Sequence, residues 1–273
     1  FRNIVDKERT LSQFHIRYYP KNQKVYPKIV QIFRLGFGQA PVNFPPLTAR
    51  LIYEKFLSET KQDSYTVFDM CSGWGGRLLG ALSSNLKIHY VGTDVNSNNF
   101  GLYSELAKFY NGNSGGKNTF EMFQDGCEII SENKRFQKHK GKLDLCFTSP
   151  PYFSREQYSS DKEQSCNSFP NYNDWLKGFL LPTIITCYDY LKSDKYMLIN
   201  IADVKYQDKD IIPLEQDTIS LAVRNGFKFE GTMGMVMSRM IGLNPKNVRN
   251  NWFDYDSRTY YKIEPILIFK KNG

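Results

Sequence analysis

The sequence predicts an α/β fold: a mostly parallel sheet of seven strands with helices on both faces. From residue 44 onward, segments with the pattern of strands alternate with segments of helical pattern, and turns that carry Gly or Asp follow several of the strands. Consecutive parallel strands need a helical crossover, so this alternation is typical of a parallel sheet covered on two sides. The predicted strands are 65–70, 87–94, 118–125, 142–149, 195–204, 227–237 and 264–271, and the predicted helices are 44–57, 77–84, 97–110, 126–136, 172–191 and 214–226.

Local signals support these elements in order along the chain. Pro46 suits the first turn of the first helix, and Leu47, Leu51 and Ile52 mostly follow one face of it. Short apolar runs that end in polar or Gly-rich turns mark the strands. The helix 172–191 contains a proline, and Gly226 is placed to end the last helix. The two final strands follow each other without a helix, which predicts a hairpin at the sheet edge.

The 273 residues suffice for one large domain with an appendage. Residues 1–43 are polar and aromatic-rich without a clear period, so we expect an N-terminal extension there. Residues 44–273 form the predicted catalytic domain. Two long polar stretches, near 153–171 and 237–261, are predicted as inserted loops, and loops of this length are usually functional or disordered.

The charge and composition of the chain indicate which classes of binding partner to expect. The net charge of +8 favours an anionic partner, nucleic acid being the commonest, with solubility alone as the alternative. The five Cys and three His show no metal-binding spacing, so we expect neither a zinc site nor a disulfide framework. No apolar run reaches the roughly 18 residues of a membrane span, and the opening FRNIVDKERT is polar. These features predict a cytoplasmic protein without membrane association.

A glycine-rich turn follows the first strand, in the stretch FDMCSGWGGRLLG. Asp69 ends the strand, and Gly73, Gly75 and Gly76 precede a helix. In open α/β sheets, ligands bind outside the carboxyl ends of the strands, and glycines let the backbone approach them closely. The run fits neither a P-loop nor a dinucleotide fingerprint. A cofactor turn and a plain tight turn remain open alternatives on this evidence.

Two more acidic residues end predicted strands. Asp94 lies 25 residues after Asp69, where an acidic side chain suits two ribose hydroxyls. Asp125 ends the third strand and is placed to accept a hydrogen bond from an adenine amine. For each residue the alternative is a helix N-cap.

The fourth strand ends in Thr148, Ser149, Pro150, Pro151 and Tyr152. Two prolines fix the backbone and remove two N–H donors, so the direction of the Pro150 carbonyl is set in advance. An exocyclic base amine is a poor nucleophile, and two fixed acceptors, the Ser149 side chain and this carbonyl, would polarise its N–H bonds. Tyr152 offers a face for a base flipped from its stack. The alternative is a Pro-rich end to a core strand.

These motifs resemble those of amino-directed DNA methyltransferases. TSPPYF resembles their catalytic motif, DMCSGWGGR their S-adenosylmethionine motif, and NFPPLTARLIYEKF the helix that lines the methionine end of the cofactor. The order of these motifs along the chain is similar to the gamma-type arrangement of the family. The resemblance covers roughly residues 44–270. The resemblance implies a Rossmann-like class I methyltransferase fold and S-adenosylmethionine as cofactor. The implied cofactor-binding residues are Phe44, Pro45, Thr48, Asp69, Cys71, Gly73, Gly75, Asp94, Val95, Asp125, Gly126 and Thr148.

The resemblance also implies a reaction: methylation of the exocyclic amine of a flipped base in double-stranded DNA, with catalytic residues Ser149, Pro150, Pro151 and Tyr152. A Ser at the first motif position favours cytosine N4, and adenine N6 stays the alternative. RNA or a protein glutamine as the acceptor, or a non-catalytic subunit that binds cofactor and DNA, are the competing interpretations.

Recognition of DNA is assigned to the two predicted loops. Arg155 and Tyr158 in the first, and Arg239, Lys246 and Arg249 in the second, are the predicted DNA-binding residues, because Arg, Lys and aromatic side chains suit phosphate contacts and stacking. A plain surface insert is the alternative for the second loop. Neither loop is large enough for a separate recognition domain, so a specificity subunit or a missing N-terminal region is a further expected partner.

Overall fold

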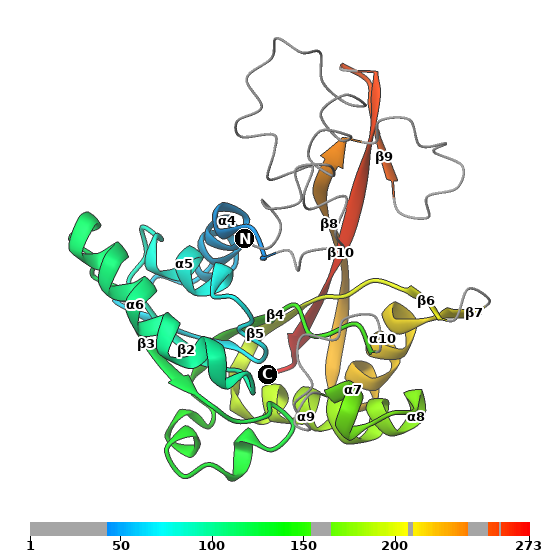
Figure 1. The fold of residues 1–273 in the computed structure, drawn as a ribbon, viewed down its shortest axis with the longest axis horizontal. Coiled ribbons are helices and arrows are strands. Elements are labelled where there is room, and N and C mark those ends of the chain that lie inside the picture. The colour runs from blue at the N-terminus through cyan, green and yellow to red at the C-terminus, as the bar shows by residue number, and fades with distance from the viewer. Residues whose placement is uncertain (1–42, 154–164, 207–209, 240–250, 257) are drawn as a thin grey trace, which may run out of the picture. The chain divides into compact units, whose positions relative to one another are not determined.

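The computed structural model describes residues 43–153, 165–206, 210–239, 251–256 and 258–273. In this part of the chain an eight-stranded sheet forms the centre of the fold (Figure 1). Its strands are β1 (Tyr65–Asp69), β2 (Ile88–Thr93), β3 (Thr119–Phe123), β4 (Leu143–Thr148), β5 (Leu191–Asn200), β8 (Phe227–Arg239), β9 (Asn251–Asp254) and β10 (Thr259–Lys271). A separate hairpin consists of β6 (Val204–Tyr206) and β7 (Asp210–Ile212).

The order of the strands is β3-β2-β1-β4-β5-β10-β8, with β9 paired to β10. Strands β1 to β5 run parallel, and β10 runs antiparallel to both β5 and β8. The sheet is therefore mostly parallel, with the final hairpin at its edge that the sequence predicted. The prediction of an α/β fold is confirmed.

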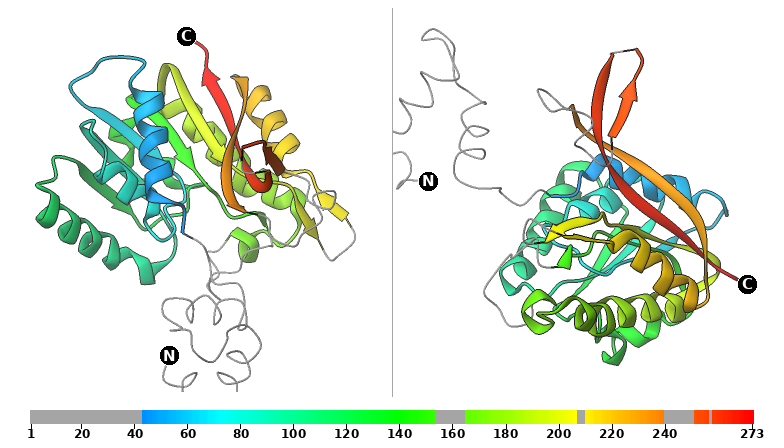
Figure 2. Two further views of the ribbon diagram at one scale, coloured as in Figure 1. Left: turned by 90° about the horizontal axis from the view of Figure 1, so that it is seen from above. Right: turned by 90° about the vertical axis from the view of Figure 1, so that its right-hand side faces the viewer.

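Helices cover both faces of the sheet (Figure 2). One apolar cluster joins α4, α5 and α6 to one face, through residues such as Ala49, Leu78 and Ala107. A second cluster joins α9 and α10 to the other face, through Ile184 and Ala222. The helical elements are α4 (Pro46–Leu57), α5 (Gly76–Leu82), α6 (Ser97–Ser114), the 3₁₀ turns η1 (Ile130–Glu132) and η2 (Phe136–His139), α7 (Ser165–Ser168), α8 (Tyr172–Trp175), the π turn η4 (Leu176–Leu180), α9 (Leu181–Tyr190) and α10 (Leu214–Arg224).

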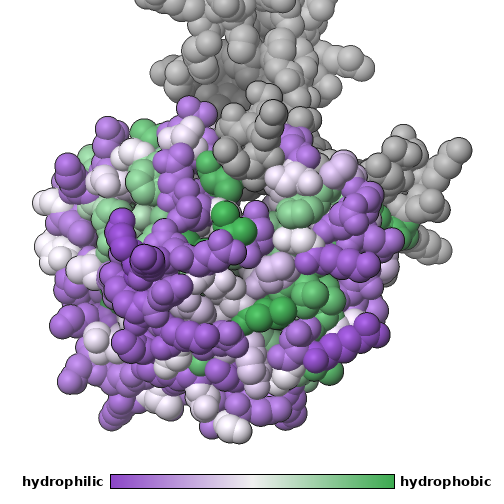
Figure 3. Space-filling view, turned by 90° about the horizontal axis from the view of Figure 1, so that it is seen from below, coloured by the Kyte–Doolittle hydropathy of each residue, from purple (hydrophilic) through white to green (hydrophobic). Residues whose placement is uncertain are grey.

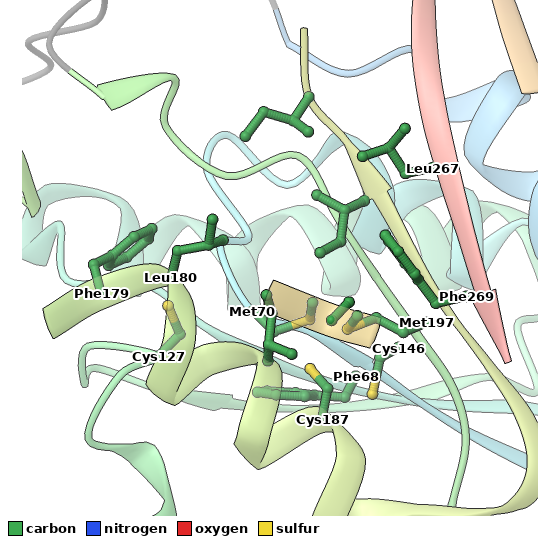
Figure 4. Packing of buried hydrophobic residues seen from close by; sticks show 14 of the residues in the cluster. Phe68, Met70, Cys127, Cys146, Phe179, Leu180, Cys187, Met197, Leu267 and Phe269 are labelled. Atoms are coloured by element: carbon green, nitrogen blue, oxygen red, sulfur yellow. The ribbon is translucent and has the colours of Figure 1, made fainter. Parts of the chain in front are cut away.

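Apolar side chains gather between these layers. Figure 4 shows part of the second cluster, to which Phe68 of β1, Met70 just after that strand, and Phe179 and Leu180 of the helical side all contribute. The face drawn in Figure 3 is mostly hydrophilic, with apolar residues in separate patches. Among the described residues, none of the helices combines the length and apolar character needed to cross a membrane.

Strand β4 carries a buried charge within its apolar run. All six of its residues are buried, including Asp144. The Asp144 carboxylate accepts hydrogen bonds from the backbone N–H of Thr66 (2.8 Å), from Gln62 Nε2 (2.9 Å) and from Lys192 Nζ (2.6 Å). A buried carboxylate is tolerated only when it is paired in this way. The strand beneath the Ser-Pro-Pro-Tyr motif is thus tied to its neighbours on both sides.

The helix predicted at 126–136 is wrong. The structure has two short 3₁₀ turns, η1 and η2, in this region. Asn133 breaks the segment: its backbone is extended, and its side chain accepts from the N–H of Arg135 (2.9 Å) and donates to Asp125 (2.7 Å). Asn side chains compete in this manner with helical backbone bonds.

The long helix predicted at 172–191 is present with an irregularity in the middle. Helix α8 continues through the π turn η4 into α9, and Pro182 follows that turn directly. Proline lacks the N–H of a regular helical bond, and π turns are one of the known ways in which a helix absorbs such a break.

The last strands extend past the rest of the sheet. Ile266 of β10 pairs with Asn200, the final residue of β5, so residues 259–265 continue beyond the carboxyl end of β5 (Figure 1). There they pair with β8 and β9. We call this extension, in which β10 is flanked by β8 and by β9, the ribbon: residues 233–239, 251–256 and 258–265. The described part of the predicted 237–261 loop is therefore largely strand, and residues 240–250 and 257 lie outside the described residues.

Gly80 permits the close packing of α4 on α5, and its replacement tests that contact. A methyl group at Gly80 would lie 2.6 Å from Ala49 Cβ and 2.8 Å from the Pro46 carbonyl oxygen. We expect Gly80→Ala to lower the free energy of unfolding by about 1–3 kcal/mol, because overpacking strains the backbone contact. Gly101→Ala is the matched control, since its methyl group would meet open space in α6. Gly101→Ala should raise the free energy of unfolding by about 0.5–1 kcal/mol. Urea unfolding measures both, and equal midpoints would contradict the tight contact.

Candidate active site

The predicted site residues follow neighbouring strands. Because β3, β2, β1 and β4 are adjacent and parallel, their carboxyl ends meet at one edge of the sheet. Asp125, Asp94, Asp69 and Ser149 lie at or just after these ends. The structure therefore brings the predicted cofactor residues and the Ser-Pro-Pro-Tyr motif to the same edge.

The turn after β1 depends on glycines. Gly73 and Gly75 have φ angles of 56° and 78°, in the left-handed region that side chains rarely adopt. At Gly76 a methyl group would overlap the Phe44 carbonyl and the Asn43 side chain. The turn is thus tightly wound, with the N-terminus of α5 held against the start of α4.

Asp69 occupies the centre of the site and is fully buried. Arg77 of α5 donates from Nε to Asp69 Oδ2 (2.8 Å) and from Nη2 to Asp69 Oδ1 (3.2 Å). Tyr90 of β2 donates to Oδ2 (2.5 Å), and Thr148 of β4 donates to Oδ1 (2.9 Å). Both carboxylate oxygens are bonded within the protein, so Asp69 holds the cofactor turn in place through its neighbours.

Cys71 joins this network through its backbone. Its N–H is shared between Asp69 Oδ1 (3.3 Å) and Thr148 Oγ1 (3.1 Å), and its carbonyl accepts from Arg77. The Cys71 thiol lies 3.8 Å from the thiol of Cys127. This hydrogen bond and burial raise the pKa of Cys71 well above its usual value, so the thiol stays protonated.

Asp94 links the second strand to the glycine turn. Its Oδ2 accepts from the Gly73 N–H (2.7 Å) and its Oδ1 from the Asn96 N–H (2.9 Å). Burial raises the pKa of Asp94 above the ordinary 3.8, although these two N–H bonds oppose the rise. An ionised carboxylate has acceptor positions beyond these two, which leaves capacity for hydroxyl donors. Val95 follows and is half-buried.

Asp125 lies two residues past the end of β3. Its carbonyl accepts from Thr93 Oγ1, and its Oδ2 accepts from Asn133 Nδ2 (2.7 Å). Asp125 is half-buried, and the neighbouring Gly126 is buried. The residue therefore lies beside Thr93, just before Asp94.

The predicted methionine-end helix packs directly on the site. Phe44 is buried, with its ring 5.3 Å from that of Phe147 in β4 and 5.4 Å from the Arg77 guanidinium. Pro45 is the N-cap residue of α4, and Thr48 lies half-buried in the first turn. The helix start is thus fixed against both the glycine turn and the strand that carries the motif.

The motif itself leaves β4 as a compact turn. Ser149, Pro151 and Tyr152 are half-buried and Pro150 is buried. The next residue, Phe153, has a φ of 50°. A left-handed bulky residue is strained, and such strain is stored where the surrounding packing holds it. Here Tyr172 and Trp175 pack on the Phe153 ring, at 5.5 and 5.9 Å between ring centres.

Most predicted DNA-binding residues cannot be placed. Arg155, Tyr158, Lys246 and Arg249 lie outside the described residues, and Arg239 is placed only by its backbone, as the last residue of β8, opposite Tyr261. The described ribbon is aromatic: Trp252 and Tyr255 are exposed, and the Trp252 ring lies 5.9 Å from that of Tyr261.

Several residues that shape the site were missed from the sequence. Arg77 and Tyr90 hold Asp69, while Tyr103 and Asn99 of α6 donate to the Gly73 carbonyl at 2.5 and 3.2 Å. Arg77 stands in the glycine stretch itself, and a basic residue so close to Asp69 was a usable signal. Tyr90, Asn99 and Tyr103 follow apolar or polar patterns that carry no such signal.

These residues fit a nucleoside cofactor. Gly73 has open space where a side chain would stand, its N–H group lies in the turn, and the half-buried Asp94 carboxylate is adjacent to it. Close backbone approach combined with a carboxylate 21 residues along the chain is the donor and acceptor set that a ribose needs.

The fold is that of the class I S-adenosylmethionine-dependent methyltransferases. Two solved structures are similar to this chain. One, from work on the conversion of a disulfide bond into a thioacetal group during echinomycin biosynthesis, has a TM-score of 0.51 and 14% identity, over 90% of this chain and 92% of its own. The other is geranyl diphosphate methyltransferase in complex with SAM, with a TM-score of 0.50 and 9% identity, over 92% of each chain. At such identities the likeness concerns the fold.

Within that class, residues 143–273 match the family model of the N6/N4 DNA methylases, described as DNA methylase. The predicted resemblance to amino-directed DNA methyltransferases is thereby confirmed over the part of the chain that carries the Ser-Pro-Pro-Tyr motif. No curated protein matches the sequence. The family match and the fold together support methyl transfer, with S-adenosylmethionine as the cofactor.

Removal of Arg77 tests the buried network. We expect Arg77→Met to lower the free energy of unfolding by about 3–5 kcal/mol, because it leaves the buried Asp69 carboxylate without its charged partner. Arg50→Met is the matched control, since Arg50 forms only a partly exposed pair with Glu54 within α4. Arg50→Met should lower the free energy of unfolding by at most about 0.5 kcal/mol. Urea unfolding measures both variants, and equal losses would contradict the role of Arg77.

The raised pKa of Asp94 predicts a pH dependence of cofactor binding. A carboxyl group with a raised pKa takes up its proton at a higher pH than a free Asp side chain does. Because ribose hydroxyls bind best to the ionised form, affinity for S-adenosylmethionine should fall as the pH is lowered from neutral toward the raised pKa of Asp94, at a higher pH than for an unshifted Asp side chain. Asp94→Asn should bind more weakly and lose this fall. Calorimetric titration checks both, and identical affinities for parent and variant across this range would exclude the ribose role.

Proposed function

We propose that this protein transfers a methyl group from S-adenosylmethionine to the exocyclic amine of a base in double-stranded DNA, with cytosine N4 favoured over adenine N6. The observation that carries the proposal is the position of Ser149 to Tyr152. This motif follows the strand whose last residue, Thr148, is bonded to Asp69 in the cofactor network. The residues proposed to bind the cofactor and those proposed to bind the base are therefore neighbours.

The cofactor half rests on the sheet edge described above. S-adenosylmethionine supplies an activated methyl group on its sulfonium centre when it is bound. We assign the ribose to Asp94 and the adenine to Asp125, with Gly73 and Gly75 providing close backbone approach. Phe44, Pro45 and Thr48, at the start of α4, stand beside the glycine turn and are assigned to the methionine end.

The base half rests on the motif. Ser149 Oγ and the Pro150 carbonyl accept hydrogen bonds from the two N–H groups of the base amine, which shifts electron density onto the nitrogen. Tyr152 stacks on the flipped base, an interaction worth about 1–3 kcal/mol. Orientation of the amine toward the methyl group contributes most of the remaining acceleration. The Phe153 turn and its aromatic packing hold these groups in place.

Ser149 is favoured for cytosine because the family resemblance links Ser at this position with N4 methylation. Both amines are attached to aromatic rings and need the same pair of acceptors, so the chemistry of the site is shared.

The ribbon is the proposed DNA contact. It continues β10 past the carboxyl end of β5, which is the edge of the sheet that carries the motif. Its exposed Trp252 and Tyr255, together with exposed Arg258 and Lys262, provide stacking faces and positive charge. Arg155, Tyr158, Arg239, Lys246 and Arg249 remain predicted contacts, and a specificity subunit or an N-terminal region remains a proposed partner.

Methylation of DNA by the Ser149→Ala variant tests the proposal. We expect the rate to fall about 100- to 1000-fold, as for the loss of one preorganised polar group in other active sites, with unchanged affinity for S-adenosylmethionine. Ser193→Ala, at an exposed position in β5, is the matched control and should keep full activity.

The product identifies the substrate. Duplex DNA, RNA and a protein with an accessible glutamine are incubated with methyl-labelled cofactor, and modified bases are identified by mass spectrometry. Label in N4-methylcytosine would support the full proposal. Label in N6-methyladenine would support the proposed methyl-transfer site but contradict the preference for cytosine. Label only in RNA or protein would refute the DNA assignment, and full activity of Ser149→Ala would refute the role of the motif.

A further inference from the structure

A cluster of metal-ligating side chains lies away from the proposed methyl-transfer site. His89 of β2, Glu121 of β3 and His139 of η2 each offer one ligand atom, and these atoms all lie within 4.8 Å of one another. The sheet register explains the arrangement. His89 pairs with Thr119, and Glu121, two residues further on, projects from the same face as Thr119. The η2 turn brings His139 over that face.

Two imidazole nitrogens and one carboxylate oxygen are a ligand set for a divalent transition-metal ion such as Zn²⁺, with one position left for water. In a tetrahedral site with bonds of about 2.0–2.1 Å, ligand atoms stand roughly 3.3 Å apart. His139 Nε2 and Glu121 Oε2 are already 3.2 Å apart. The His89 ring centre lies 6.0 Å from that of His139, and the three ligand atoms lie within 4.8 Å of one another, so small side-chain adjustments would bring the set to bonding distance.

Groups around the cluster orient two of its members. His89 Nδ1 lies 2.8 Å from Thr119 Oγ1, and this hydrogen bond leaves Nε2 available as a ligand. Arg135 donates to Glu121 Oε1 (3.0 Å), the oxygen that does not face His139. Hydrogen bonds of this kind to the far side of a ligand are typical of metal sites, because they fix the orientation of the ligating atom.

One cation competes for the same place. Lys138 Nζ lies 2.8 Å from Glu121 Oε2, the oxygen that faces His139. The Lys138 side chain is 56% exposed, whereas that of Glu121 is 13% exposed. An exposed ammonium group holds a carboxylate only weakly and returns to water at little cost. A divalent ion that also gains two imidazole ligands would therefore displace it.

The protonation states also suit ligation. Burial is the main reason that the pKa values of His89 and His139 lie below the usual 6.5. Burial would raise the pKa of Glu121, but hydrogen bonds from Lys138, His139 and Arg135 outweigh it and bring the value to about 2. Neutral imidazole and ionised carboxylate are the forms that bind metal.

We propose that His89, Glu121 and His139 form a structural site for a divalent transition-metal ion of the Zn²⁺ type. His89 is the second residue of β2, whereas the residues assigned to the cofactor follow the other end of that strand. The site therefore lies toward the amino end of β2, away from the proposed chemistry. A bound ion would join β2, the edge strand β3 and the η2 turn, and so stabilise this side of the sheet.

The test uses Co²⁺ as the probe on the full chain, with visible absorption for affinity and circular dichroism to confirm folding. We expect one ion to bind with nitrogen and oxygen ligands, and affinity to fall at least about tenfold in His89→Ala and in His139→Ala. His15→Ala is the matched control because it replaces the third His of the chain, and its affinity should be unchanged. Lys138→Gln should bind more tightly than the parent, since it removes the competing ammonium group.

Glu121→Gln keeps the size of the side chain and serves if an alanine variant does not fold; its affinity should also fall at least about tenfold. The cysteines are the competing ligands, and thiolate ligation would add an intense near-ultraviolet charge-transfer band. Such a band, or equal affinity in parent, Glu121→Gln and either folded His variant, would overturn the proposal. Absence of Co²⁺ binding by the folded parent would overturn it as well.

Discussion

The buried carboxylate of Asp69 is the constraint on which the arrangement of the site depends. A charge removed from water must be paired and hydrogen-bonded, and Arg77, Tyr90, Thr148 and the N–H of Cys71 meet that requirement together. These partners come from α5, β2, β4 and the glycine turn. The hydrogen bonds to this one carboxylate therefore hold α5, β2, β4 and the glycine turn in fixed positions relative to the end of β1. Strand β4 is the one that leads into the Ser-Pro-Pro-Tyr motif.

The two halves of the site are held by different means. Around the proposed cofactor position, Gly73 is bonded through its N–H to Asp94 and through its carbonyl to Tyr103, so the turn is bound on both sides. The motif after β4 is held by packing, with two prolines and the strained Phe153 under Tyr172 and Trp175. A rigid cofactor position beside a separately packed base position suits a reaction whose main requirement is alignment.

The sequence was sufficient for what depends on local pattern. Alternating strands and helices, the turn at Gly73 and Gly75, and the sharing of one sheet edge by Asp94 and Ser149 all followed from period, glycine position and the geometry of parallel strands. Other features depend on contacts that the pattern of apolar and polar residues does not reveal. The Asn133 bonds that break the helix predicted at 126–136, the closeness of His89 to Glu121 and His139, and the pairing that turns part of 237–261 into strand arise only when the chain is folded.

The ribbon shares backbone bonds with the central sheet only at its base. Strand β5 ends opposite Ile266. Beyond that point, among the described residues, the backbone of β10 pairs with β8 and β9, and the Asn200 side chain adds one hydrogen bond to the Pro265 carbonyl (2.9 Å). Changes in length or sequence at the far end therefore leave the core and the Asp69 network undisturbed. In evolutionary terms, the outer end of the ribbon is free to diverge at a different pace from the sheet edge that carries Asp69.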